Sequence, residues 1–473
     1  MTGLEALATR ASALALGDLP EGVRAETKRM LLDMLACVVA AQATRAGDIS
    51  ARVAAGMGHA AGRTSLMGDA YLLARLGDAM DFEEGCAGAH FGCGAVAAAL
   101  ALARVHETSG ADLLLSIATG YELAARLSAA TGSYYVADAE GRQVFAPVWG
   151  IAAPVVMAAV GAGARLRALE PAVGAQAYAH ALSNAPVPIG AKWNLAVDLP
   201  DTKYCDTGWC ALAGLGGVLA AEAGSTALPD LVDGDNGFFR MLSAPNARPE
   251  RLTAAWGESW AISGIVYKDW PCCGMLLPAM ANLTDLLAEH AIEPTEIEAI
   301  HLTTGAAATS ARFANQEPAT FASRQFSFPH AFAMLCLGVP GGPDWLSDET
   351  DRRADVQALR RRVTVGEHDP HAANGRVLPL RRRPSSVTIK TARGSFSCET
   401  DLDTPVVARH ERRWTDADAE SKFRALVDGP EADTIIDAIR SLETLPSVLP
   451  VIKALDRARP IAAAASNLSE QLP

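Results

Sequence analysis

The sequence lacks every short motif that marks a nucleotide or redox cofactor. It contains no GxGxxG after a strand pattern, no P-loop, no GxSxG and no lysine-centred signature of pyridoxal phosphate binding. The sequence also has few cysteines. The nine cysteines show neither a paired CxxC metal spacing nor the density of a disulfide-stapled domain. We therefore expect no cofactor, no metal and reduced thiols.

Positive charge and long apolar runs are missing as well. The chain carries 41 Lys and Arg against 54 Asp and Glu, a net charge of −13, so we expect no nucleic-acid partner. Apolar stretches such as residues 154–163 are shorter than the roughly 18 residues of a membrane span, and residues 1–16 do not resemble a targeting peptide. The sequence thus predicts no membrane partner and a cytoplasmic location. An anionic substrate would need a local group of basic side chains.

Half of the residues are hydrophobic and only 20% are charged, so 473 residues can bury a large core in more than one domain. Apolar residues recur at helical spacing through much of the first half, where alanine is abundant and β-branched runs are scarce. The predicted helices span residues 21–41, 95–106, 111–131, 154–166, 175–182 and 211–224. The first half is therefore predicted to be a close-packed helical bundle.

The pattern changes after Trp270. Strand-like alternation predicts a smaller α+β region, and helical spacing then resumes near the C-terminus. The predicted elements are a helix at 277–290, strands at 297–303 and 363–365, a charged helix at 347–361, a hairpin of 386–391 and 394–399 turning at 393–394, and helices at 416–427 and 432–442.

The most informative segment is residues 76–104, in which Asp78, Asp81, Glu83 and Glu84 precede a glycine-rich turn that carries His90. Nearby carboxylates tune the pKa and tautomer of an imidazole, and the N-terminus of the following helix favours a substrate carboxylate. The alternative is a capped loop in which His90 only satisfies backbone carbonyls. A zinc site is less favoured, because no second His or Cys falls at ligand spacing on the same element.

Two lysines lie at junctions between loops and helices. Lys203 precedes an apolar helix, and Lys268 precedes the Cys272-Cys273 pair. Each can bind a carboxylate or act as a base when desolvated, and the alternative for each is a solvated surface lysine. A nucleophilic role for either cysteine lacks support, because no histidine is nearby in the sequence.

A third candidate segment, residues 323–330, places Arg324 and His330 at the start of another apolar helix. A guanidinium suits bidentate binding of a carboxylate. The alternative is an ordinary helix cap with His330 packed over Phe328.

Several segments together resemble the MmgE/PrpD family, which includes 2-methylcitrate dehydratase and cis-aconitate decarboxylase. Asp81-Phe82-Glu83-Glu84 followed by His90 resembles the acidic loop and histidine of that family. The other matching segments follow in the same order along nearly the whole chain, at residues 30–37, 109–114, 120–127, 203–211, 234–242, 268–273, 326–333 and 421–424.

The resemblance implies an α+β fold in which a large all-helical domain is capped by a smaller α+β lid. The helical domain would combine residues 1–268 with the C-terminal helices of 406–473, and the lid would span 269–405. It also implies a homodimer and a cofactor-free enzyme that acts on a small di- or tricarboxylic acid. By position, Asp81, His90, Lys203 and Lys268 would line the cleft between the two domains.

Four positions depart from the family pattern. Ala146 stands where a second histidine is expected, Asp206 and Leu277 replace two further histidines, and His330 replaces a tyrosine. Ala146 cannot move a proton, so His330 is a candidate for the lost acid. These departures also permit a different substrate.

The leading hypothesis is a lyase of the dehydratase type, in which a proton α to a carboxylate is removed while an acid assists departure of a β-substituent. His90 is predicted as base or acid, with Asp81 as its orienter. The other predicted site residues are Lys203 and Lys268 for carboxylate binding or proton return, His330 as a further acid, and Arg324, Asp206 and Cys273 beside the substrate. The alternatives are an epimerase of the iminodisuccinate epimerase kind, a decarboxylase of a cis-aconitate-like acid, and a catalytically silent dimeric paralogue.

Overall fold

The computed structural model describes most of the chain. The described residues are 1–60, 63–86, 88–137, 139, 143–148, 150–203, 205–234, 237–242, 244, 246–305, 308–367, 384–400 and 414–461. The predicted domain boundary at 405–406 lies outside them, as do residues 204 and 235–236 of two segments that resemble the family.

The first part of the chain forms a region made almost entirely of helices, as the alanine-rich periodicity predicts. It contains α1 (Gly3–Ala13), α2 (Glu21–Ala41), α3 (Arg45–Gly56), α4 (Leu66–Asp78), α5 (Gly92–Ala103), α6 (Gly110–Thr131), α7 (Ala152–Leu166), α8 (Pro171–Ser183), α9 (Gly190–Leu195), α10 (Thr207–Glu222) and α11 (Phe238–Met241), with a small hairpin of β1 (Tyr135–Ala137) and β2 (Gln143–Phe145). Small residues let these helices approach closely. A Cβ on Gly120 of α6 would lie 2.4 Å from the carbonyl oxygen of Ala158 on α7, so only glycine fits at that crossing.

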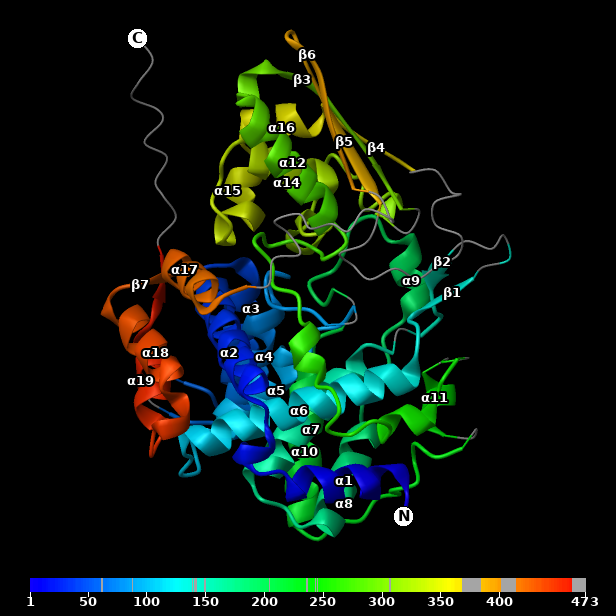
Figure 1. The fold of residues 1–473 in the computed structure, drawn as a ribbon, viewed down its shortest axis with the longest axis vertical. Helices are drawn as coiled ribbons and strands as arrows, with labels where there is room; N and C mark the ends of the chain where they lie inside the picture. The colour runs from blue at the N-terminus through cyan, green and yellow to red at the C-terminus, as the bar shows by residue number, and fades with distance from the viewer. Residues whose placement is uncertain are drawn as a thin grey trace.

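The second region is a small mixed sheet with helices packed against it, and Figure 1 shows it at the opposite end of the molecule from α1 and α8. Its elements are α12 (Leu277–His290), β3 (Ile297–Thr304), α13 (Phe321–Arg324), α14 (Phe328–Cys336), α15 (Asp348–Asp351), α16 (Ala354–Arg360), β4 (Val363–Glu367), β5 (Ser385–Thr391) and β6 (Gly394–Thr400). The strand order is β4-β3-β5-β6, with β3 parallel to β4 and antiparallel to β5. We call residues 277–400 the sheet region.

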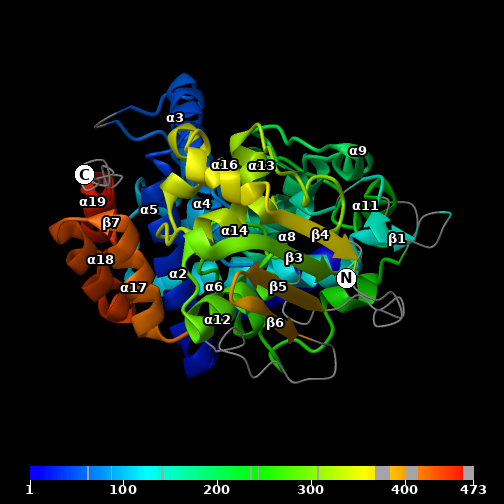
Figure 2. The ribbon, with the colours of Figure 1, turned by 90° about the horizontal axis from the view of Figure 1, so that it is seen from above.

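The last described helices return to the helical region. α17 (Asp416–Leu426) packs against α2, and α18 (Pro430–Arg440) and α19 (Leu449–Arg457) pack against each other, with β7 (Val427–Asp428) and β8 (Arg459–Pro460) pairing beside them. Although α17 is far from α2 in the sequence, both views show the two helices side by side (Figures 1 and 2). The mainly helical α+β fold class predicted from the sequence is confirmed.

Two local predictions are corrected. The charged segment predicted as one helix over 347–361 forms two short helices, because Arg353 adopts extended backbone (ψ 130°) between α15 and α16. The β5–β6 hairpin turns at Ala392 and Arg393, and Gly394 already pairs with Thr391 as the first residue of β6. Helices α1, α3, α4 and α19 and the β1–β2 hairpin were not predicted from the sequence.

Within the described residues, no single helix has both the length and the apolar composition to cross a membrane, although α2 and α3, bent by 91° at their junction, pass that test as a pair.

Candidate active site

The acidic loop, residues 79–91, joins the end of α4 at Asp78 to the start of α5 at Gly92. Its close packing requires glycine at position 92, because a Cβ there would lie 2.5 Å from Oε1 of Glu84, which accepts a hydrogen bond from the Gly92 amide at 2.7 Å. Asp81 adopts a left-handed backbone with φ 54°, as does Lys203 with φ 49°. Such conformations are costly for residues other than glycine and concentrate at functional sites.

Two ammonium groups converge on the Asp81 carboxylate. The side chain of Lys268 forms a close ion pair with Oδ1 of Asp81, and its Nζ donates to the Asp81 carbonyl at 2.8 Å. Nζ of Lys203 lies 3.7 Å from Oδ2 of Asp81 and donates to the carbonyl of Asp78 at 2.9 Å. Both lysine side chains are almost completely buried, so neither is the solvated surface lysine of the alternative interpretation.

The imidazole of His90 completes this group. Its Nδ1 lies 2.9 Å from Oε1 of Glu83 and 2.8 Å from the carbonyl oxygen of Glu84, and its Nε2 lies 3.7 Å from Oδ1 of Asp81. The His90 side chain is 13% exposed, whereas those of Asp81, Glu83, Lys203 and Lys268 are at most 2% exposed. His90 is therefore the member of this group through which a ligand from solvent first makes contact. We call Asp78, Asp81, Glu83, His90, Lys203 and Lys268 the charged cluster.

The protonation states follow from these contacts. Burial lowers the pKa of His90, but the charges of Glu83 and Asp81 outweigh it and raise the pKa to about 9. Burial raises the pKa of Asp78 to about 7, and it raises that of the neighbouring Glu84 to about 8. Burial raises the pKa of Asp81, but the charges of Lys203 and Lys268 outweigh this effect and lower the pKa below its ordinary value.

The net charge at this place is therefore positive near neutral pH. His90, Lys203 and Lys268 are cationic, Asp81 and Glu83 are anionic, and Asp78 is only partly ionised. A chain of net charge −13 thus contains one buried place suited to an anionic ligand, as the sequence analysis required.

Asp81, Glu83 and His90 also form a group whose ligand atoms lie within 4.8 Å of one another and could hold a metal ion. However, both ammonium groups already contact the Asp81 carboxylate. A divalent ion bound there would be repelled by two nearby positive charges, so this donor set suits the lysines better than a metal.

Arg324 and His330 lie in a second group of charges, in the sheet region, whose basic side chains are buried and whose acidic side chains are partly exposed. Nη1 of Arg324 donates to the Leu346 carbonyl at 2.7 Å and pairs with Asp348 at 2.8 Å. Both ring nitrogens of His330 are engaged, Nδ1 by Nη2 of Arg360 at 2.6 Å and Nε2 by the Trp345 carbonyl at 2.5 Å. We call Arg324, His330, Asp348, Asp351 and Arg360 the sheet-region cluster.

This arrangement corrects two predicted roles. The guanidinium of Arg324 is already paired with carboxylates of its own region, which argues against its binding a substrate carboxylate. His330 is fully buried, and burial together with Arg360 lowers its pKa to about 3, which argues against the predicted role as an acid near neutral pH. The helix cap of the alternative interpretation is present, because Ser327 is the N-cap of α14 and its hydroxyl accepts from the His330 amide at 3.0 Å.

Asp206 and Cys273 occupy the edges of the site. Asp206 is the N-cap of α10, and its carboxylate accepts from the Gly208 amide at 3.0 Å and lies 3.6 Å from Nε of Arg75. The Cys273 amide donates to the carbonyl of Gln325, whose side chain in turn donates to the Ala79 carbonyl of the acidic loop. Asp206 thus has a structural role that the sequence analysis did not foresee, and a substrate contact for either residue stays a prediction.

Glu83 was not selected from the sequence, although it was noted in the acidic run. In the structure its Oε1 lies 2.9 Å from Nδ1 of His90, and its side chain has zero exposure. No signal in the sequence distinguished it from Glu84, because which of two adjacent acids faces the imidazole depends on the loop backbone.

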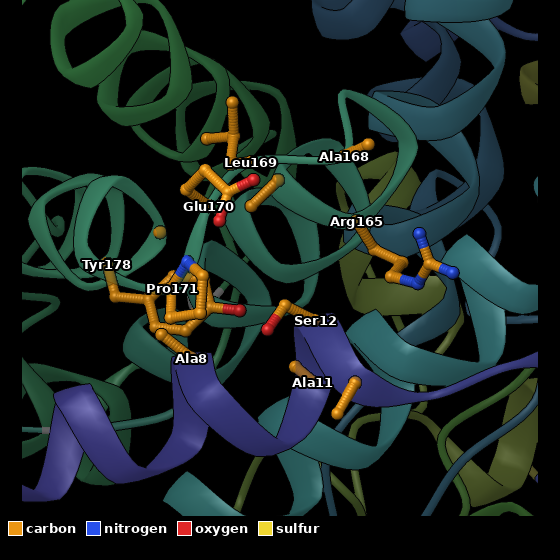
Figure 3. Close-up of a pocket in the computed structure, with 12 residues that line it drawn as sticks. Ala8, Ala11, Ser12, Arg165, Ala168, Leu169, Glu170, Pro171 and Tyr178 are labelled. Atoms are coloured by element: carbon orange, nitrogen blue, oxygen red, sulfur yellow. The ribbon is translucent and has the colours of Figure 1, made fainter.

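A separate cavity of about 290 Å³ lies between α1 and the α7–α8 junction, at the far end of the helical region from the sheet. Figure 3 shows its alanine-rich wall with Arg165, Glu170 and Tyr178. It contains no member of the charged cluster, so it does not compete with that cluster as the place of proton transfer.

Two family models match nearly the whole chain. The MmgE/PrpD N-terminal domain matches residues 5–250, and the MmgE/PrpD C-terminal domain matches residues 270–444. The chain belongs to the MmgE/PrpD family. Among proteins with curated descriptions, none matches it. Membership of this family supports a dehydratase- or lyase-like activity in general terms.

Proposed function

We propose that this MmgE/PrpD protein is a cofactor-independent lyase of the dehydratase type that acts on a small di- or tricarboxylic acid. The observation that carries the proposal is the convergence of Lys203, Lys268 and His90 on Asp81 in a buried place of net positive charge. Cations placed in advance stabilise the enolate-like charge of the transition state more than they stabilise the substrate.

His90 is the proposed acid. With a pKa raised to about 9 it carries a proton at neutral pH, and its exposed edge can deliver that proton to a departing β-hydroxyl group, which leaves as water when the C–O bond breaks. The Glu84 carbonyl accepts from Nδ1, with the Glu83 carboxylate 2.9 Å from the same nitrogen, and Nε2 is thereby left to face Asp81 and the substrate. His90 ends this step as a neutral imidazole and regains its proton in the next half of the cycle.

Asp81 is the proposed base that takes the α-proton. In the free protein the two ammonium groups lower its pKa and so keep it ionised and weakly basic. Substrate carboxylates bound by Lys203 and Lys268 would compete with Asp81 for the same ammonium protons. The basicity of Asp81 would then rise once the substrate is in place.

The test is incubation of the purified protein with citrate, 2-methylcitrate, aconitate and iminodisuccinate in deuterated water, followed by NMR and mass spectrometry. The lyase is supported by elimination or hydration with deuterium incorporated at the α-carbon. Deuterium exchange with inversion and without elimination would replace it by an epimerase, and loss of CO₂ would replace it by a decarboxylase. Inertness of a correctly folded protein toward all four acids overturns the proposal and favours the silent paralogue.

We also propose a homodimer, with small carboxylic acids as the other partners. One face of α10 supports it, because Trp209 and Leu219 are 49% and 41% exposed on a helix that is apolar all round. Sedimentation of the purified protein, with Trp209→Glu as the disrupting variant, tests this assembly. A monomer at micromolar concentration contradicts it.

A further inference from the structure

Lys422 of α17 reaches from the C-terminal helices to the charged cluster, although it lies 340 residues along the chain from the acidic loop. Its Nζ donates to Oδ1 of Asp33 at 2.7 Å, to the Phe82 carbonyl at 2.6 Å and to the Lys268 carbonyl at 3.2 Å. The ammonium group also lies 3.7 Å from the centre of the Phe82 ring. An ammonium group has three protons, and these three acceptors engage them.

The two carbonyls that Lys422 binds belong to the segments whose side chains form the central ion pair. Phe82 directly follows Asp81, and Lys268 itself supplies the ammonium group that contacts Asp81. Lys422 thus binds both backbones beside the ion pair from the side of the helical region. Because all three of its protons are engaged and its side chain is only 6% exposed, it is not placed to bind substrate or move a proton.

The same place joins the two passages of the chain between the helical region and the sheet region. On the outgoing passage, Gly85 and Val266 exchange backbone hydrogen bonds of 2.8 Å as an isolated bridge, which attaches the segment before Lys268 to the acidic loop. On the returning passage, the Trp414 ring stacks on Tyr267 at 4.9 Å, one residue before Lys268. Lys422 lies two turns beyond Trp414 and ties both passages to Asp33 on α2.

We propose that Lys422 is a positioning residue, which sets the register between the acidic loop and the Lys268 segment and so the geometry of the Asp81–Lys268 ion pair. This inference rests on the proposed function only for its effect on turnover. The competing account is a purely structural one, in which Lys422 matters because it neutralises the buried Asp33 carboxylate. The two accounts differ in what replacement of both charges would do.

The main variant is Lys422→Met, which keeps the length of the side chain and removes its protons. Lys28→Met is the matched control, because Lys28 also joins α2 to the C-terminal helices, through Glu443 and the Arg440 carbonyl, but does not touch the charged cluster. A double variant, Asp33→Leu with Lys422→Met, removes both buried charges and avoids leaving either of them unpaired.

The first measurement needs no substrate. Hydrogen exchange at the Gly85 and Val266 amides should accelerate at least about tenfold in Lys422→Met and in the double variant, and should be unchanged in Lys28→Met. Unchanged exchange at both amides in a folded Lys422 variant overturns the positioning role, whether or not the proposed reaction is correct.

The second measurement is turnover of whichever acid the wild-type protein converts. A misplacement of about 1 Å costs about 100-fold, so kcat should fall by that factor in the double variant while KM changes less than about threefold. If Lys422→Met fails to fold, the double variant carries the test alone. A double variant that recovers both the melting temperature and wild-type kcat shows that only charge neutralisation mattered, and this outcome also overturns the proposal.

Discussion

The charged cluster and the sheet-region cluster are built from the same kinds of side chain but differ in the charge beside their histidine and in its exposure. In the sheet-region cluster, carbonyls of Trp345 and Leu346 and nearby carboxylates accept from the histidine and the arginines. In the charged cluster, backbone carbonyls likewise accept from both lysines and from His90, but the His90 side chain remains 13% exposed, whereas His330 is fully buried. A buried histidine with no exposed edge holds a fold together, whereas one with an exposed edge is available for chemistry.

The two histidines show this difference most directly. Burial lowers the pKa of both, but the neighbour of His90 is a carboxylate and that of His330 is a guanidinium. The pKa of His90 is therefore raised to about 9 and that of His330 is lowered to about 3. At neutral pH the first is a charged proton donor and the second is a neutral spacer between an arginine and a carbonyl.

The largest effect is expected from Asp81→Asn, which keeps the shape of the side chain and removes the charge on which both lysines and His90 converge. Lys268 would keep its bond to the residue 81 carbonyl but lose its ion pair, and the proposed base would be gone. We expect turnover to fall by about 1000-fold or more. The measurement is steady-state kinetics with the acid that the wild-type protein converts. Retention of about a tenth of the activity would show that the charged cluster is structural, like its counterpart in the sheet region.

The next effect is an alkaline limit on activity set by His90. The working form is the imidazolium, so kcat/KM should be level below about pH 9 and fall about tenfold per pH unit above it, because the pKa of His90 is raised to about 9. The contribution of His90 to the stability of the fold also falls as the pH rises. Because the folded pKa is raised above its ordinary value, the stability that His90 contributes is fully present below about pH 6.5 and lost as the pH rises through about 9.

Rates for this profile should be taken where circular dichroism shows the protein folded, because burial also raises the pKa of Glu84, to about 8, and its ionisation destabilises the protein in the same direction. The control is His90→Gln, whose residual activity should lack the alkaline limb. A limb that survives this change would assign the titration to another group.

A smaller and different effect is expected from His330→Leu in the sheet-region cluster. Arg360 keeps Asp351 but loses the ring nitrogen at 2.6 Å, and because leucine offers no acceptor, a buried donor left without its acceptor costs about 1–3 kcal/mol. The expected result is a lower denaturant midpoint with turnover within about threefold of wild type. If turnover instead drops about 100-fold at unchanged stability, the predicted acid role of His330 is restored and the contrast between the two clusters disappears.

The sequence predicted the helices well where periodicity is strong. The predicted bounds of α2 and α12 coincide with those observed, because an apolar stripe at helical spacing specifies a buried helix without tertiary information. Helix α4 was missed, since its Asp69, Arg75 and Asp78 are buried as partners of distant residues and interrupt the apolar pattern. The segment of α15 and α16 was predicted as one helix, because its charged sequence carries no signal for the extended backbone at Arg353.

The residues of the candidate site likewise differ in whether local sequence or tertiary contacts reveal their role. Asp81 and His90 are close in sequence, so the acidic loop was visible as a composition, and the two lysines were found at abrupt junctions. The roles of Arg324 and His330 could not be judged from the sequence. Residue type does not reveal whether the N–H groups of a side chain already donate to a backbone carbonyl. Lys422 was noted only as a family landmark, since nothing local to α17 indicates that it contacts Phe82 and Lys268.

The smallest effect is expected at Asp206, for which both a structural role and a role in substrate binding are open. As the N-cap of α10 it accepts from the Gly208 amide, and its charge faces Arg75, itself beside Asp78 of the charged cluster. Asp206→Asn keeps a good cap and loses only the charge, so we expect a destabilisation of a few tenths to about 1 kcal/mol and an unchanged KM. Asp206→Ala, which removes the cap as well, should cost about 1 kcal/mol more. Chemical denaturation of both variants measures these differences. If Asp206→Asn instead raises KM about tenfold while stability is unchanged, Asp206 contacts the substrate, and the charged cluster extends across Arg75 to the start of α10.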